Sequence, residues 1–151
     1  MPPPTPPAGR REFLLFVYDA WMTGQPSSAR LEGARSLGPA ATPPTFDLVD
    51  LGRDIILVPG GQTEVKGELF SLDPTLLASL DIEKGHPLRF KRVSIQLADG
   101  QTAHAYTLDP DQVRGRRRIR SGDYKEHAAP AAPPQRDGAW SRWAKSRASG
   151  R

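Results

Sequence analysis

The sequence contains no cysteine, and this absence removes several classes of chemistry. Without thiols the chain can form no disulfide bond, no thiolate nucleophile and no cysteine-bound zinc site. Long apolar runs are also missing, since no stretch approaches the roughly 18 apolar residues that a membrane helix needs. The first seven residues include five prolines and offer no apolar core for a signal peptide. We therefore expect a cytoplasmic protein without a membrane partner.

Several catalytic and cofactor motifs are absent as well. The glycines form no G-x-G-x-x-G pattern and precede no Lys-Ser or Lys-Thr pair, so the usual nucleotide-binding loops are excluded. No serine lies in a G-x-S-x-G segment. His86, His104 and His127 lack the close helical spacing of metal ligands, so we expect no metal site. Acid–base chemistry by a carboxylate is the class that remains.

Charge is distributed unevenly along the 151 residues, whose formal net charge is +4. Residues 1–110 hold ten Lys and Arg against thirteen Asp and Glu, whereas residues 111–151 hold eleven against four. Five of these arginines lie within residues 114–120. This cluster lacks interleaved aromatic residues, so nucleic-acid binding is the least favoured function.

The length fits one domain between two tails. We expect residues 1–11 to be a disordered proline-rich terminus and residues 127–151 a disordered basic tail, because both hold too little apolar surface to offset the entropy of ordering. Residues 12–126 should fold around one core.

The pattern between the tails predicts mainly strands and one clear helix. Asp73 can cap a helix that begins at Pro74, and Gly85 can end it. A shorter helix can run from Pro26 to Glu32. The predicted strands cover residues 13–18, 45–51, 55–58, 64–71, 88–97 and 101–108. Asp99-Gly100 predicts a tight hairpin between the last two. This order indicates an α+β class with a small mixed β-barrel or curved sheet.

Glu83 is the candidate for acid–base catalysis. At about 100° per residue, Leu76, Leu80 and Glu83 project close together, so the glutamate extends the stripe that faces the core. Burial and the helix C-terminus would then both raise its pKa. If instead the helix frays after Leu80, Glu83 is solvated. Both readings stay open on these residues alone.

Five segments in order resemble the γ-glutamylcyclotransferase-like superfamily. They are Phe-Val-Tyr-Asp-Ala-Trp-Met-Thr-Gly (16–24), Val-Lys-Gly-Glu-Leu-Phe (65–70), Leu-Asp-Ile-Glu (80–83), Phe-Lys-Arg (90–92) and Ser-Gly-Asp-Tyr (121–124). The resemblance spans about residues 13–126. It implies a small mixed α/β barrel, release of 5-oxoproline from γ-glutamyl compounds and no cofactor.

The resemblance also assigns site residues. It makes Glu83 the general acid/base and places it in a pocket lined by residues 18–21, with Phe90 nearby. Tyr18, Asp19, Ala20, Trp21 and Phe90 are thus the implied substrate-binding residues. Where the family usually has Tyr-Gly-Ser/Thr-Leu, this chain has Tyr-Asp-Ala-Trp. The carboxylate of Asp19 would repel a substrate carboxylate if it pointed into the pocket.

Two functions follow from these residues. The retained Glu83 favours an enzyme that acts on a γ-glutamyl amine or amino acid. The altered loop at Asp19 and Trp21 favours a catalytically silent binding or scaffold protein, with the basic tail as an arm for a protein partner.

Overall fold

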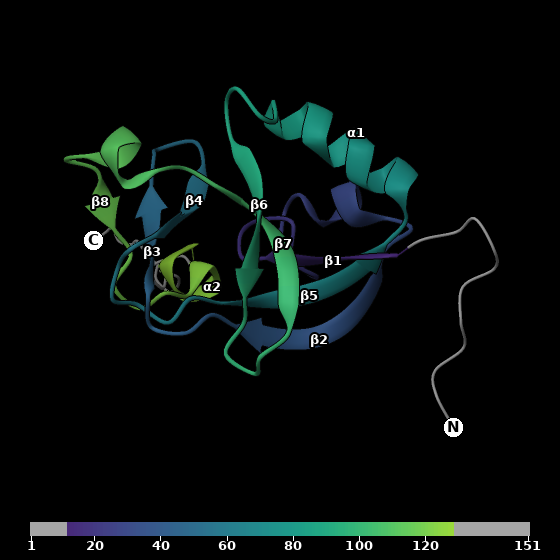
Figure 1. Ribbon diagram of the computed structural model, residues 1–151, viewed down its shortest axis with the longest axis horizontal. Coiled ribbons are helices and arrows are strands. Elements are labelled where there is room, and N and C mark those ends of the chain that lie inside the picture. The colour runs from purple at the N-terminus through teal and green to yellow at the C-terminus, as the bar shows by residue number, and fades with distance from the viewer. Residues whose placement is uncertain (1–11, 129–151) are drawn as a thin grey trace, which may run out of the picture.

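Strand β1 (Phe13–Val17) lies inside an eight-stranded sheet in the computed structural model, which describes residues 12–128 (Figure 1). It pairs antiparallel with β5 (Lys66–Leu72) and parallel with β7 (Thr102–Thr107). Leu15 and Phe16 point to opposite faces and are both fully buried. The predicted central strand is therefore confirmed, and it explains the uninterrupted apolar run.

The other strands are β2 (Arg35–Ala41), β3 (Phe46–Asp50), β4 (Ile55–Pro59), β6 (Lys91–Gln96) and β8 (Arg117–Arg118). Their order is β2-β5-β1-β7-β4-β3-β8, and β6 pairs with β7 outside this path. The predicted hairpin is confirmed as the antiparallel pair β6–β7. The sequence did not predict β2 or β8.

Strand β7 makes a fork in the sheet that positions the functional site. Its residue His104 pairs with Leu15 of β1, and its residue Thr107 pairs with Leu57 of β4, both in parallel. Strand β4 therefore replaces β1 along one edge of β7. The loop after β1 and the turn before β4 meet where this exchange occurs.

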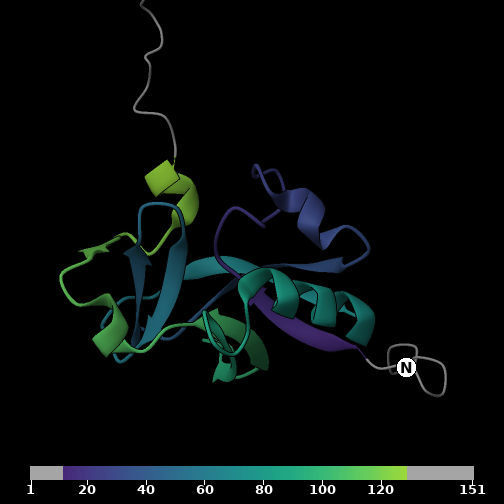
Figure 2. The same ribbon diagram turned by 90° about the horizontal axis from the view of Figure 1, so that it is seen from above.

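Helix α1 (Pro74–Lys84) covers the sheet beside β1 (Figures 1 and 2). The carboxylate of Asp73 accepts a hydrogen bond of 2.8 Å from the amide of Leu76, so the predicted cap is confirmed. Gly85 ends the helix in the left-handed conformation, with φ of 67°. Leu77 and Leu80 pack into the core.

Three short helices complete the described residues: η1 (Ser28–Leu31), η2 (Pro110–Val113) and α2 (Tyr124–Ala128). The predicted short helix near residues 26–32 is thus a 3-10 helix. Helix α2 extends beyond the predicted domain end at residue 126. The rest of the two predicted tails lies outside the described residues.

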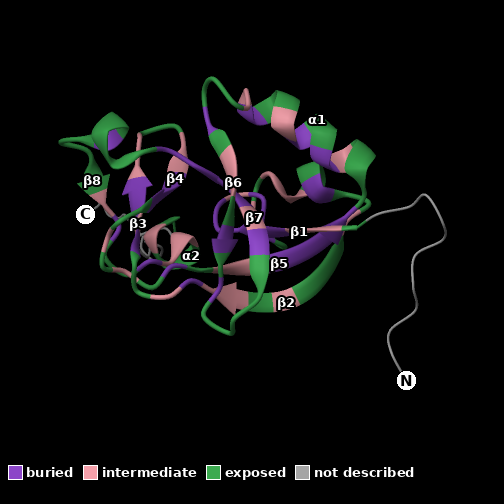
Figure 3. Cartoon of the chain, in the orientation of Figure 1, coloured by how far each residue is buried: buried purple, intermediate pink, exposed green. Residues whose placement is uncertain are grey.

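Buried residues lie in the middle strands of the sheet, whereas much of β2 and of α1 is exposed (Figure 3). The buried apolar side chains form one cluster that contains residues from every strand except β2 and β8. This mixed curled sheet with few helices confirms the predicted α+β class. Within residues 12–128, no helix is long and apolar enough to cross a membrane.

Candidate functional site

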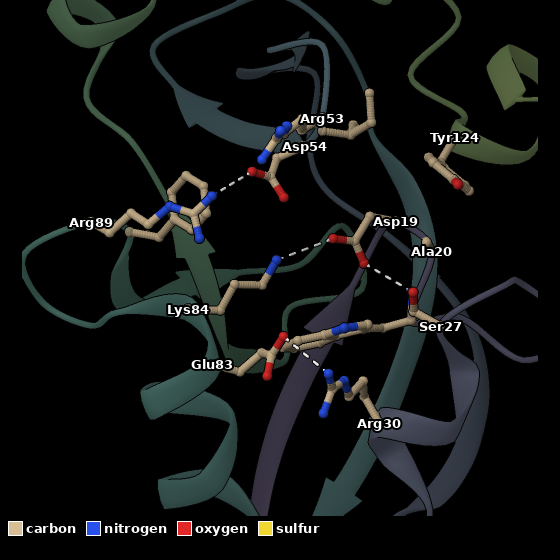
Figure 4. A pocket seen from close by; sticks show the side chains of 13 residues that line it. Asp19, Ala20, Ser27, Arg30, Arg53, Asp54, Glu83, Lys84, Arg89 and Tyr124 are labelled. Atoms are coloured by element: carbon tan, nitrogen blue, oxygen red, sulfur yellow. Dashed lines mark hydrogen bonds and ion pairs between the residues drawn. The ribbon is translucent and has the colours of Figure 1, made fainter.

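A cavity of about 230 Å³ opens at the fork between β1 and β4 (Figure 4). The loop after β1, the η1 region, the turn before β4 and the end of α1 form its walls. Its lining residues are Asp19, Ala20, Trp21, Ser27, Arg30, Arg53, Asp54, Ile55, Glu83, Lys84, Arg89, Phe90 and Tyr124. Most of these side chains are polar or charged, so the cavity suits a small polar ligand rather than an apolar one.

A buried ion pair crosses the cavity. The Nζ atom of Lys84 lies 3.4 Å from Oδ2 of Asp19, and the residues are only 7% and 9% exposed. The other oxygen of Asp19 accepts a hydrogen bond of 3.1 Å from the amide of Trp21, which fixes the carboxylate within its own loop. Asp19 therefore points into the cavity, and its charge there is balanced by Lys84. We call Asp19 and Lys84 the buried pair.

Two aromatic rings surround the cation of the buried pair. Lys84 Nζ lies 4.5 Å from the ring centre of Trp21 and 5.4 Å from that of Phe90. Both distances allow cation–π attraction. The position at the end of α1 also favours a cation, because the helix dipole is negative there. These contacts hold an ammonium group at a largely buried site.

Two further ion pairs are more exposed, and we call them the rim pairs. Arg30 lies 3.4 Å from Glu83, with side chains 57% and 44% exposed. Arg89 donates a hydrogen bond of 2.8 Å to Asp54. Each rim pair joins two separate segments of the cavity wall (Figure 4). Arg53 lines the same cavity and makes no ion pair with the described residues.

The predicted burial of Glu83 is wrong. The buried stripe of α1 consists of Leu77, Leu80 and Lys84, at spacings of three and four residues. Glu83 precedes Lys84 by about 100° of rotation and lies at the edge of this stripe, where its carboxylate pairs with Arg30. The helix does not fray, so Glu83 is exposed because of its orientation.

The implied substrate-binding residues divide into two groups. Asp19, Ala20, Trp21 and Phe90 line the cavity, together with Glu83. Tyr18 does not line it, because the side chain is buried and its hydroxyl donates a hydrogen bond of 2.7 Å to the carbonyl of Tyr106. Burial raises the pKa of Tyr18, and the charge of Asp19 adds to that rise. Tyr18 therefore joins β1 to β7.

Sequence reasoning missed Lys84, although a signal for it existed. Two sets of residues have the spacing of one helix face equally well. They are Leu77, Leu80 and Lys84, and Leu76, Leu80 and Glu83. Because lysine side chains are usually exposed, the face with Glu83 was the one considered as the buried face. Arg30, Arg53, Asp54, Arg89 and Tyr124 were missed because they come from turns and ends that only the fold brings together.

A hydrogen-bond network under α1 fixes the helix end. Asp81 accepts hydrogen bonds of 2.8 and 3.0 Å from Arg92 and one of 2.7 Å from the hydroxyl of Tyr106. Partial burial raises the pKa of Asp81, but these hydrogen bonds outweigh burial and hold it below its usual value. Arg92 also contacts His104, whose pKa is lowered by burial and by that guanidinium. Lys84 and Glu83 thus extend from a fixed turn.

Glu68 fixes the opposite wall. Its carboxylate accepts hydrogen bonds from the amide and hydroxyl of Thr23, at 2.8 and 2.7 Å, and from the hydroxyl of Ser36. Burial raises the pKa of Glu68, and these donors more than offset it, so the pKa is lowered. Glu68 therefore holds the loop that carries Asp19 against β5.

Comparisons with known proteins agree with this fold. A family model described as gamma-glutamyl cyclotransferase, AIG2-like, matches residues 15–126. A Vibrio cholerae protein named "Putative gamma-glutamylcyclotransferase" is 34% identical over 113 residues, which cover 75% of this chain and 96% of that protein. The solution structure of protein ytfP from Escherichia coli is 30% identical with a TM-score of 0.60, covering 76% of this chain and 98% of that one. The structure of an aig2-like protein from Mus musculus shares the fold at 24% identity, with a TM-score of 0.59 and coverage of 65% and 78%.

Proposed function

Since the chain belongs to the AIG2-like gamma-glutamyl cyclotransferase family, we propose that it releases 5-oxoproline from a γ-glutamyl amine or γ-glutamyl amino acid. The observation that carries this proposal is the polar cavity at the fork of the sheet. Loop residues 19–21 and Glu83 line the same cavity, although strands β2 to β5 lie between them in the sequence. Its volume of about 230 Å³ suits a small ligand rather than a macromolecule.

The proposed reaction requires no chemical step from the protein's side chains beyond proton transfer. The α-amino nitrogen of the substrate attacks its own γ-carbonyl carbon and forms the five-membered ring. The bond from that carbon to the leaving amine breaks. The attacking nitrogen loses one proton, and the leaving nitrogen gains one. Atoms and charges balance without water or a redox partner.

We assign the proton transfer to Glu83. Its carboxylate lies at the cavity wall, and the ion pair with Arg30 holds it there. A general acid/base of this kind contributes typically about 10²- to 10⁴-fold to the rate. The remaining acceleration would come from a cavity that folds the γ-glutamyl chain for ring closure.

A second candidate is ligand binding without turnover. The observation that favours it is the buried pair, because a lysine rather than a carboxylate occupies the buried end of α1. Under this alternative the cavity holds a small ligand, and Glu83 serves only to pair with Arg30.

Release of 5-oxoproline from a panel of γ-glutamyl amino acids and amines tests the proposal. We expect the natural chain to be active and Glu83→Gln to lose at least about 100-fold in turnover, because the amide cannot accept the proton. The thermal midpoint should stay the same, since an exposed ion pair contributes little stability.

Glu64→Gln is the matched control, because Glu64 is exposed and does not line the cavity. This variant should retain full activity. Turnover that survives in Glu83→Gln would remove Glu83 from catalysis. Binding of the panel compounds without any 5-oxoproline release would favour the second candidate.

A further inference from the structure

The ammonium group of Lys84 has unused hydrogen-bonding capacity. It carries three N–H donors. Within residues 12–128, Asp19 is the single hydrogen-bond acceptor for this group, at a distance of 3.4 Å. That distance is longer than the roughly 2.7 to 2.9 Å of a strong charge-assisted hydrogen bond. A lysine that is only 7% exposed therefore keeps donors without a protein partner.

The unpaired N–H groups of Lys84 can reach an acceptor only in the cavity. Trp21 and Phe90 cover Lys84 with aromatic rings, which attract the cation but accept no conventional hydrogen bond. The remaining side of Lys84 lines the cavity. Because buried donors are costly when they stay unpaired, the cavity is expected to supply an acceptor to this ammonium group.

We propose that Lys84 binds the carboxylate of the ligand in this cavity. A carboxylate provides the acceptors and the negative charge that match a largely buried ammonium group. Asp19 acts as a positioning residue, which holds Lys84 Nζ in place. The excess of cations in the cavity lining offsets the repulsion between the carboxylates of Asp19 and the ligand. The inference rests on the proposed function, because this carboxylate is the one that γ-glutamyl compounds and 5-oxoproline share.

The charges around the cavity favour such a ligand. Its lining includes the cations Arg30, Arg53, Lys84 and Arg89 and the anions Asp19, Asp54 and Glu83. The cavity therefore has one more positive than negative charge. Added negative charge on the ligand balances this excess, and the carboxylate need not displace Asp19 to reach the free donors of Lys84.

Calorimetric titration with a matched ligand pair tests the proposal without turnover. 5-Oxoproline and 2-pyrrolidinone share the same lactam ring and differ by the carboxylate. The natural protein should bind 5-oxoproline at least about tenfold more tightly, since a charge-assisted hydrogen bond is worth that factor or more. Lys84→Met should bind the two compounds equally.

Two further variants separate recognition from folding. Lys84→Met leaves Asp19 buried and unpaired, so we compare it with the double variant Asp19→Asn/Lys84→Met, which removes both charges. We expect the double variant to recover most of the lost thermal stability and still to show no preference for 5-oxoproline. Lys91→Met is the matched control, because Lys91 also pairs with an aspartate at 3.4 Å but lies outside the cavity. It should keep the full preference.

In the titration, three results would overturn the inference: a natural protein that binds both compounds equally, one that binds neither, or a folded Lys84→Met or double variant that keeps the preference. These failures are distinct from failure of the proposed function. Carboxylate-dependent binding without 5-oxoproline release would leave Lys84 as the ligand-binding residue of a silent relative. Release of 5-oxoproline by Lys84→Met with unchanged KM would support the proposed enzymatic function. It would also show that Lys84 does not bind the substrate.

Discussion

Asp81 joins the last turn of α1 to the strands beneath it. Its two oxygens accept from the guanidinium of Arg92 on β6 and from the hydroxyl of Tyr106 on β7. Burial also raises the pKa of Tyr106, and the hydrogen bond to Asp81 adds to that rise, so its hydroxyl remains a donor. One carboxylate thus links three elements.

We expect Asp81→Asn to destabilise the protein by about 2 kcal/mol at neutral pH, because hydrogen bonds between charged groups are lost. The pKa of Asp81 is lower in the folded protein than its unfolded value of about 3.9. The stabilisation is therefore complete above that pH and is lost as the pH falls through the folded pKa. Denaturant titrations at pH 7 and at the lowest pH where the protein folds should show this difference shrinking.

Asp111→Asn is the control for that measurement. Asp111 also pairs with an arginine, at 2.9 Å, but its side chain is highly exposed. Its loss should cost less than about 1 kcal/mol. An equal cost for both variants would show that the Asp81 network does not carry the stability assigned to it.

Residues of the site differ in how far the sequence could identify them. Asp19, Trp21 and Phe90 were found because they lie in segments that resemble a family. Glu83 lines the same cavity as Asp19 and Trp21, but its predicted burial is wrong, since neighbouring residues on a helix differ by about 100° and the sequence did not show which one faces inward. The helix spacing could have indicated that Lys84 is buried, but its pairing with Asp19 could not be found, because the pair joins two segments that are distant along the chain.

At the level of elements, the loop after β1 depends on a residue of β5. Glu68 accepts two hydrogen bonds from Thr23 and one from Ser36 of β2. Asp19 and Trp21 lie in the same loop and line the cavity. The shape of that cavity wall is therefore set partly from outside the cavity.

We expect Glu68→Ala to release this loop. Amide hydrogen exchange at Thr23 should accelerate at least about tenfold, because the amide loses its acceptor. Binding of 5-oxoproline should weaken, while the amides of α1 stay as protected as in the natural protein.

Glu64→Ala serves as the control for loop release, since Glu64 is an exposed residue just before β5. It should leave exchange at Thr23 unchanged. Unaltered exchange at Thr23 in Glu68→Ala would mean that other contacts hold the loop.

Strands were predictable from the sequence where their side chains form a clear apolar or turn pattern. The apolar run of β1 and the hairpin β6–β7 carry strong patterns, and both are confirmed. Strand β2 has no such pattern, because it lies at an edge, is mostly exposed and contains Gly38 and Pro39. It forms because β5 offers a free edge, with a register shift at Gly38 that accommodates the irregular sequence.

For the whole molecule, the central strand pairs only with distant partners. Strand β1 contacts β5 and β7, so neither pair can form before long loops have closed. We expect refolding from denaturant in milliseconds to seconds rather than microseconds, because such topologies fold slowly. Stopped-flow far-UV circular dichroism measures this rate. A single microsecond phase would show that local structure, not the sheet, limits folding.

The rim pairs and the buried pair differ in their access to solvent ions. Arg30–Glu83 and Arg89–Asp54 are largely exposed to solvent, whereas Asp19–Lys84 is largely buried. Dissolved salt screens exposed charges within a Debye length of about 8 Å at physiological ionic strength, but it reaches a buried pair far less. Rising salt therefore loosens the contacts between the outer walls while the ammonium group stays in place. Ionic strength should therefore change the rate at which a ligand enters the cavity more than the strength of its contact with Lys84.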